Sequence, residues 1–294
     1  MSNFLQYCVI GIANGSIIAM VAMSLVIIYR ATGLLNFAQG EISMLATFVV
    51  WQCHDVGVPL LPALLIGMVA GFALGALLQR VAVQPVGDPA TVPLQLVIVT
   101  IGLLLVINNA AGLIWGAETK VFDRFFGNAS WSVGDVSVRW QQVGIVGVLL
   151  LETAVLVLLF RRTKIGLAMR AVASNSESSG LAGIPVARVL VISWGLAGAI
   201  GAIAGTFAAP ESAMSADLFL PILISAFAAM TIGGFDSIVG AIVGGISVGI
   251  LTEVVPRYVD PLKEMRLAPA VILILVVLMF RPQGLFGSKQ VRRA

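Results

Sequence analysis

The chain has 294 residues, of which 59% are hydrophobic and only 11% are charged. Soluble domains carry roughly 25% charged residues, so this composition excludes an ordinary soluble fold and predicts an integral membrane protein. Basic loops on one face of a membrane explain the formal net charge of +3, and no nucleic-acid partner is expected.

Nine apolar runs follow one another along the chain. They cover residues 8–29, 42–53, 60–79, 94–115, 143–160, 189–208, 219–235, 238–255 and 267–280. A helix needs about 20 apolar residues to cross a bilayer, and the second, seventh and ninth runs are short by this measure. The sequence therefore predicts an all-α polytopic membrane protein with eight to nine transmembrane helices, forming one transmembrane domain over residues 1–294. In the eight-helix alternative, one short run is a re-entrant or partial segment.

The distribution of Lys and Arg predicts the orientation, because cytoplasmic loops are enriched in both. Eleven of the 17 lie around Arg30, around Arg80, within 161–188 or within 281–293, and we place these loops in the cytoplasm. The carboxyl terminus is then cytoplasmic. The amino terminus lies outside with nine crossings and inside with eight.

The largest external insertion covers residues 117–140. Residues 131–138 alternate between apolar and polar side chains, which favours a short strand or hairpin. The insertion either caps the outer face or contacts an extracytoplasmic partner, or it is a passive loop.

A basic, partly amphipathic island at residues 161–175 separates two long apolar runs. Helical spacing places Ile165, Ala168, Met169 and Val172 on one face, and Thr163, Arg170 and Ser174 on the other. The pattern predicts a short helix that docks in a groove of a soluble partner. The alternative is a solvated loop whose basic residues only fix the orientation.

Small residues recur at four-residue spacing in several apolar runs. They are Gly67, Gly71 and Gly75; Ala197, Gly201 and Gly205; Gly240 and Gly244; and Gly245 and Gly249. Such stripes let helix backbones approach closely in lipid, so they predict tight helix packing, with a moving interface as the alternative.

Polar side chains within apolar runs are the candidate site residues, because an acid in mid-span costs about 2.5–3.5 kcal/mol on insertion scales. They are Asn14, Thr100, Asn108, Asn109, Glu152, Ser193 and Glu253, together with Asn36, Gln39 and Glu41 at the start of the second run. From this set we select Asn36, Gln39, Asn108 and Asn109 for the solute route. Hydrogen bonds that only join helices are the alternative.

No arrangement typical of catalysis or metal binding is present in the sequence. His54 is the single histidine, Cys8 and Cys53 lack metal or redox spacing, and the phosphate loop G-x-x-x-x-G-K-[ST] does not occur. We therefore expect no enzyme, no metal and no cofactor. If ATP drives this protein, another chain hydrolyses it.

Six short motifs occur along the chain: GIANGS at 11–16, TGLLNFAQGE at 32–41, RTKIGLAMRA at 162–171, GI at 183–184, GGFDSIVG at 233–240 and FRPQGLFG at 280–287. They resemble those of permease subunits of branched-chain amino acid ABC importers of the LivH type. The motifs follow the order of the family and extend over nearly the whole chain.

This resemblance implies a multi-pass permease of the bacterial inner membrane that moves a branched-chain amino acid or a related small polar solute into the cytoplasm. It implies a second homologous permease subunit, two ATPase subunits and an extracytoplasmic solute-binding protein as partners. Residues 161–188 are then the ATPase coupling segment. Its coupling residues would be Thr163, Ile165, Gly166, Ala168, Met169, Arg170 and Val172.

Two other functions remain open on the residues alone. The first is an ion-coupled secondary transporter or channel with Glu41, Glu152 or Glu253 as the ion site. The second is an intramembrane enzyme. Co-purification separates these alternatives from an ABC permease, because only the permease brings down ATPase chains.

Overall fold

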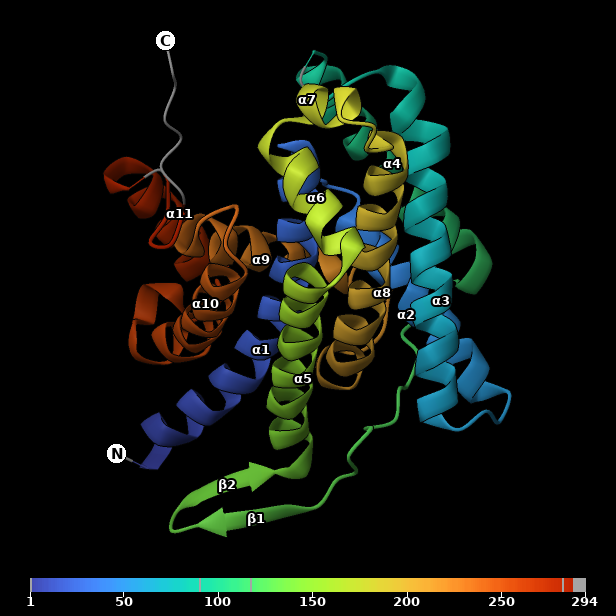
Figure 1. The fold of residues 1–294 in the computed structure, drawn as a ribbon. Helices are drawn as coiled ribbons and strands as arrows, with labels where there is room; N and C mark the ends of the chain where they lie inside the picture. The colour runs from blue at the N-terminus through green and yellow to red at the C-terminus, as the bar shows by residue number, and fades with distance from the viewer. Residues whose placement is uncertain (1, 90, 117, 282, 288–294) are drawn as a thin grey trace. The chain divides into compact units, whose positions relative to one another are not determined.

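The computed structural model describes residues 2–89, 91–116, 118–281 and 283–287 (Figure 1). Over these residues the chain forms eleven α-helices and one two-stranded hairpin, so it is nearly all-α as predicted. The helices are α1 (Ser2–Thr32), α2 (Gln39–Asp55), α3 (Leu60–Leu78), α4 (Pro93–Trp115), α5 (Trp140–Arg162), α6 (Lys164–Ser174), α7 (Ser176–Leu181), α8 (Val186–Ser212), α9 (Phe219–Gly233), α10 (Ile238–Tyr258) and α11 (Ala268–Phe280).

Each of the nine apolar runs forms a helix. Within the described residues, six helices are long and apolar enough to cross a membrane: α1, α3, α4, α5, α8 and α10. The helices α2, α9 and α11 are shorter, with 17, 15 and 13 residues, and they correspond to the three runs that are short in the sequence.

The alternating pattern at residues 131–138 forms the predicted hairpin. Strand β1 (Ser130–Val133) pairs antiparallel with β2 (Val136–Arg139), and the hairpin leads directly into α5 (Figure 1). Ser137 also binds Gln6 of α1: its N–H donates to Oε1 at 2.8 Å, and Gln6 Nε2 donates to the Ser137 carbonyl at 3.0 Å. These two bonds hold the start of α1 to the hairpin.

The chain divides into two compact units. The first unit comprises residues 1–26, 126–149 and 221–294, and the second comprises residues 27–125 and 150–220. Three helices, α1, α5 and α9, cross a boundary between the units without a break.

Glycine stripes bring the helices of the second unit close together. A Cβ atom at Gly71 of α3 would overlap the backbone of Gly198 on α8, and one at Gly75 would overlap the backbone of Trp194. On α2, Ser43 and Thr47 fill the space that side chains would occupy at Gly201 and Gly205 of α8. The structure therefore confirms tight packing at these stripes.

Glycines also allow close helix contacts in the first unit. Gly245 and Gly249 of α10 lie against the backbone of α1 at Ala19 and Gly15, and Gly240 lies against Gly233 at the end of α9. The segment that follows α11 covers this end, because the N–H groups of Leu285 and Phe286 donate to the carbonyls of Ile232 and Gly233 at 2.7 and 3.0 Å. These carbonyls belong to the last turn of α9, which has no partners for them within the helix.

Candidate functional site

A break between α1 and α2 creates the first part of the site. Gly33 turns the chain with φ +72°, a conformation that glycine adopts without strain, and Leu34 N–H donates to Thr32 Oγ1 at 3.1 Å. Asn36 Oδ1 then accepts from Ala38 N–H at 3.0 Å, which fixes the start of α2. Asn36 is only 1% exposed, so its amide lies inside the second unit.

Helix α2 carries two further buried polar side chains in its first turn, Gln39 and Glu41. Gln39 Nε2 donates to the Ala197 carbonyl of α8 at 2.9 Å. Gln39 Oε1 and Asn36 Nδ2 have no hydrogen-bond partner among the described residues. Buried polar atoms without partners are rare, so these two mark a place where another molecule or water completes the bonding.

Asn108 of α4 joins Glu41 to a third segment. Its Nδ2 lies 3.4 Å from Glu41 Oε2 and donates to the Ala216 carbonyl, between α8 and α9, at 3.1 Å. We call Asn36, Gln39, Glu41 and Asn108 the polar seam. Three of the four predicted route residues thus lie in one region of the second unit, together with Glu41.

Asn109 lies apart from the polar seam. Its side chain is exposed, and its Nδ2 donates to the Leu105 carbonyl one turn earlier on its own helix, at 2.7 Å. In the described chain this contact joins no second helix. The two neighbouring asparagines therefore have different surroundings.

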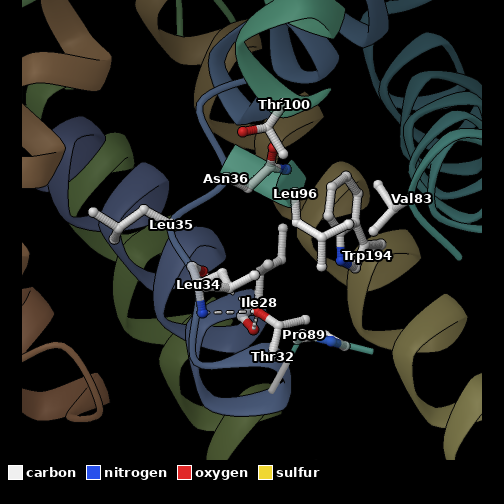
Figure 2. Close-up of a pocket in the computed structure, with 10 residues that line it drawn as sticks. All are labelled: Ile28, Thr32, Leu34, Leu35, Asn36, Val83, Pro89, Leu96, Thr100 and Trp194. Carbon is white, nitrogen blue, oxygen red and sulfur yellow. Dashed lines mark hydrogen bonds between the residues drawn. The ribbon is translucent and has the colours of Figure 1, made fainter. Parts of the chain in front are cut away.

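A small cavity opens beside Asn36 (Figure 2). Its walls come from the end of α1, the 33–36 break, the segment after α3, the first turns of α4 and the first half of α8. The lining residues are Ile28, Thr32, Leu34, Leu35, Asn36, Val83, Pro89, Leu96, Thr100 and Trp194. Figure 2 shows the side chains of Asn36 and Thr100 next to each other and the indole ring of Trp194 on another wall.

The remaining polar candidates have different roles. In the first unit, Asn14 Nδ2 donates to Glu253 Oε1 at 3.0 Å and joins α1 to α10, which supports helix-to-helix hydrogen bonding for this pair. Glu152 of α5 is buried, and neither carboxyl oxygen has a partner in the part of the chain that the structure describes.

The basic island forms helix α6 as predicted. Thr163 caps it, since Gly166 N–H donates to Thr163 Oγ1 at 3.0 Å. Met169 and Val172 are each 3% exposed and are part of the buried core, whereas Ile165 is 46% exposed. Gly166 is also buried, against the backbone of Leu159 and Phe160 of α5.

The structure therefore divides the predicted apolar face of α6. Its packed side runs through Gly166, Met169 and Val172, while Ile165 and Arg170 face outward with Leu167. Only the outward residues are available to a partner in this conformation.

The segment before the hairpin is attached to the second unit by several polar contacts. Arg124 Nε lies 3.1 Å from Glu211 Oε1 of α8, and Lys120 N–H donates to the Met214 carbonyl at 2.8 Å. His54, at the end of α2, is near Val58 O at 3.0 Å and Asp123 Oδ2 at 3.1 Å. Because both neighbours are acceptors, they raise the pKa of His54, the Val58 carbonyl contributing most.

Long apolar helices packed through glycine stripes, with buried polar groups inside, define a multi-pass helical membrane protein of the transport class. Residues 7–280 match the family described as "Branched-chain amino acid transport system / permease component". The chain belongs to this family.

Curated relatives extend over the full length of the chain. The permease protein LivH of the high-affinity branched-chain amino acid transport system of Escherichia coli (strain K12) is 28% identical, over 99% of this chain and 97% of its own length. The corresponding protein BraD of Pseudomonas aeruginosa is 26% identical, over 99% and 98%. The fructose import permease protein FruF of Bifidobacterium longum is 23% identical, over 80% and 66%.

Proposed function

We propose that this chain is the membrane-spanning subunit of an ABC importer in the bacterial inner membrane, and that it moves a branched-chain amino acid or a related small polar solute into the cytoplasm. The family match over residues 7–280 carries this proposal. The names of two full-length relatives favour a branched-chain amino acid. A more distant relative is named as a fructose import permease, so relatives of this chain carry names with different solutes.

The proposed assembly contains this permease, a second homologous permease, two ATPase subunits and an extracytoplasmic solute-binding protein. ATP hydrolysis belongs to the ATPase subunits, and the permease supplies the route. Residues 1–294 form one permease domain in this proposal, which is supported by a single family match that extends over residues 7–280.

Hydrogen bonds support a topology with nine crossings and the amino terminus outside. Gln6 and Ser137 exchange two hydrogen bonds, so the start of α1 and the 117–140 insertion lie on the same side of the membrane. The number of crossings between them is then even. Helices α1, α3 and α4 are long enough to span the membrane, which makes three crossings. An even number requires one more, and α2 supplies it.

The same reasoning extends to the carboxyl terminus. Arg124 pairs with Glu211, so the end of α8 lies outside, and Tyr258 packs against Phe4 and Tyr7, so the end of α10 lies outside as well. Helix α9 then crosses together with α10. Leu285 and Phe286 bind the inner end of α9, which requires α11 to cross and gives a cytoplasmic carboxyl terminus.

We place the solute route along the polar seam, with Asn36, Gln39 and Asn108 as route residues and Asn109 at its border. Glu41 joins the set because it shares Asn108. Polar groups buried in a membrane span are costly, and a solute route explains why they are retained.

The coupling segment is 161–188, with Thr163, Ile165, Gly166, Ala168, Met169, Arg170 and Val172 as its coupling residues. Ile165, Leu167 and Arg170 form the proposed contact with the ATPase subunit, because they face outward from α6. Thr163, Gly166, Met169 and Val172 transmit the movement of α6, because they cap it or pack it within this chain. ATP binding by the partner would then shift the helices between outward and inward arrangements.

Affinity purification tests this function directly. The tagged chain, expressed in its native host and extracted in mild detergent, should bring down an ATPase chain and a second permease. An unrelated multi-pass protein with the same tag is the control. Recovery of the chain alone, with transport that persists when cellular ATP is depleted and a proton gradient is maintained, would favour the ion-coupled alternative.

A further inference from the structure

Two residues that line the cavity of Figure 2 each carry a buried N–H donor without a partner among the described residues. Asn36 is 1% exposed and Trp194 is 2% exposed, and neither Asn36 Nδ2 nor Trp194 Nε1 has a hydrogen-bond partner among the residues that the structure describes. A buried donor left unmet typically costs about as much as a lost hydrogen bond, so such donors call for an acceptor.

The other walls of the cavity are mainly aliphatic. Ile28, Leu34, Leu35, Val83 and Leu96 contribute to them. Thr100 and Thr32 also line the cavity, but their hydroxyls already donate to carbonyls of their own helices. The cavity therefore offers two free donors within an apolar surface, which suits a ligand that has an oxygen acceptor and an aliphatic body.

The cavity is small in this conformation. Its volume is about 10 Å³, which is room for a single oxygen atom or one water molecule. Two of its walls are irregular backbone: the 33–36 break that follows Gly33, and the π-helical turn Gln79–Val83 with the turn at Gly87. Such π-helical turns are frequent at functional sites.

We propose that this small cavity is the contracted form of a binding site for the carboxylate of an aliphatic solute, held by Asn36 Nδ2 and Trp194 Nε1. The inference rests on the proposed function and specifies it, because it names the part of the solute that the route recognises. A carboxylate is an acceptor-only group, and hydrogen bonds to charged groups are about twice as strong as neutral ones. The aliphatic walls would accept the side chain once the irregular segments move apart.

Two substitutions remove one donor each and preserve the rest of the side chain. Trp194→Phe keeps an aromatic ring in this wall of the cavity but removes the indole N–H. Asn36→Asp keeps the oxygen that accepts from Ala38 N–H and replaces the donor with a second oxygen. Thr206→Val is the control, because it changes a buried residue of α8 outside the cavity whose hydroxyl donates within its own helix.

The test uses the full transporter complex with leucine as the probe and leucinamide, which has no carboxylate, as the comparison. The chain contains five tryptophans, so ¹⁵N-indole labelling gives five signals from this subunit, and Trp194→Phe identifies the one from Trp194. Leucine should move the Trp194 signal downfield, and leucinamide should not. In proteoliposomes, Trp194→Phe should lower leucine uptake roughly tenfold or more, the scale of one lost hydrogen bond to a charged group. Asn36→Asp should lower it further, while Thr206→Val should retain most of it.

Three results would overturn the inference. If the wild-type complex takes up leucine but the Trp194 signal does not respond, the cavity holds only a structural water. If Trp194→Phe and Asn36→Asp transport normally, the two donors have no role in recognition. If the wild-type complex takes up no aliphatic amino acid, the proposed function is wrong, and a carboxylate is then not the group that the cavity binds.

Discussion

Replacing Asn108 with Leu should weaken both the fold and transport, whereas the same change at Asn109, at the border of the route, should weaken both much less. Asn108 supplies the donor to Glu41 Oε2 and to the Ala216 carbonyl, and Glu41 is only 2% exposed. Leu at this position leaves two acceptors unmet. Interhelical hydrogen bonds in membranes average about 0.6 kcal/mol, and an unmet buried group costs about 1–3 kcal/mol. We therefore expect a loss of about 1–3 kcal/mol in the free energy of unfolding.

Asn109 is the matched control because it is the next residue on α4 and receives the same substitution. It bonds only to the Leu105 carbonyl and is exposed, so an apolar side chain there costs little. Unfolding in mixed detergent micelles, followed by far-ultraviolet circular dichroism, measures the difference, and solute uptake at matched expression levels measures function. Equal effects of the two variants would refute the assignment of Asn108 to the polar seam.

Further predictions concern packing, coupling and pH. Gly198→Ala should destabilise the chain by about 1–3 kcal/mol relative to Gly102→Ala. The new methyl group at residue 198 overlaps the Gly71 backbone, whereas Gly102 has open space around it. Equal unfolding midpoints for the two variants would contradict this packing. Ile165→Glu should abolish ATPase co-purification while the chain still folds. Met169→Glu should instead lower the yield of folded chain, because Met169 is buried. Normal ATPase recovery with Ile165→Glu would show that Ile165 is not part of the interface. Because the raised pKa of His54 favours its charged form in the fold, its contribution to stability should be complete below about pH 6.5 and lost as pH rises through the folded-state pKa. Thermal unfolding between pH 6 and 9 should therefore show a decline that His54→Gln reduces, and an identical pH profile for this variant would contradict the account.

The helices were predictable because hydrophobicity alone specifies them. Each of the nine apolar runs forms a helix, since backbone polar groups in lipid must be satisfied within the segment. The hairpin at 131–138 and the cap at Thr163 were also predictable, because both depend on local sequence patterns. The glycine stripes indicated which helix faces would pack, although not which partner each would meet.

The site was only partly predictable, because it depends on long-range contacts. Asn108 and Asn109 look alike in the sequence, but neighbouring residues of α4 point to different sides of the helix. Asn108 therefore lies in the polar seam, whereas Asn109 is exposed. The same limit applies to α6, whose spacing grouped Ile165 with Met169, although the contact of Gly166 with α5 turns Ile165 outward. Trp194 was missed because a tryptophan in an apolar run is usually a packing residue, and only the structure reveals its unpaired donor.

Uptake by reconstituted protein tests the central claim most directly. The chain should be placed in liposomes either alone, with an imposed proton or sodium gradient, or together with the second permease, the ATPase subunits, the binding protein and ATP. We predict leucine accumulation only in the complete system, with none in the absence of ATP or the binding protein. Gradient-driven accumulation by the chain alone, abolished by Glu152→Gln, would contradict the account, because the buried carboxyl of Glu152 would then be the coupling site of a secondary transporter.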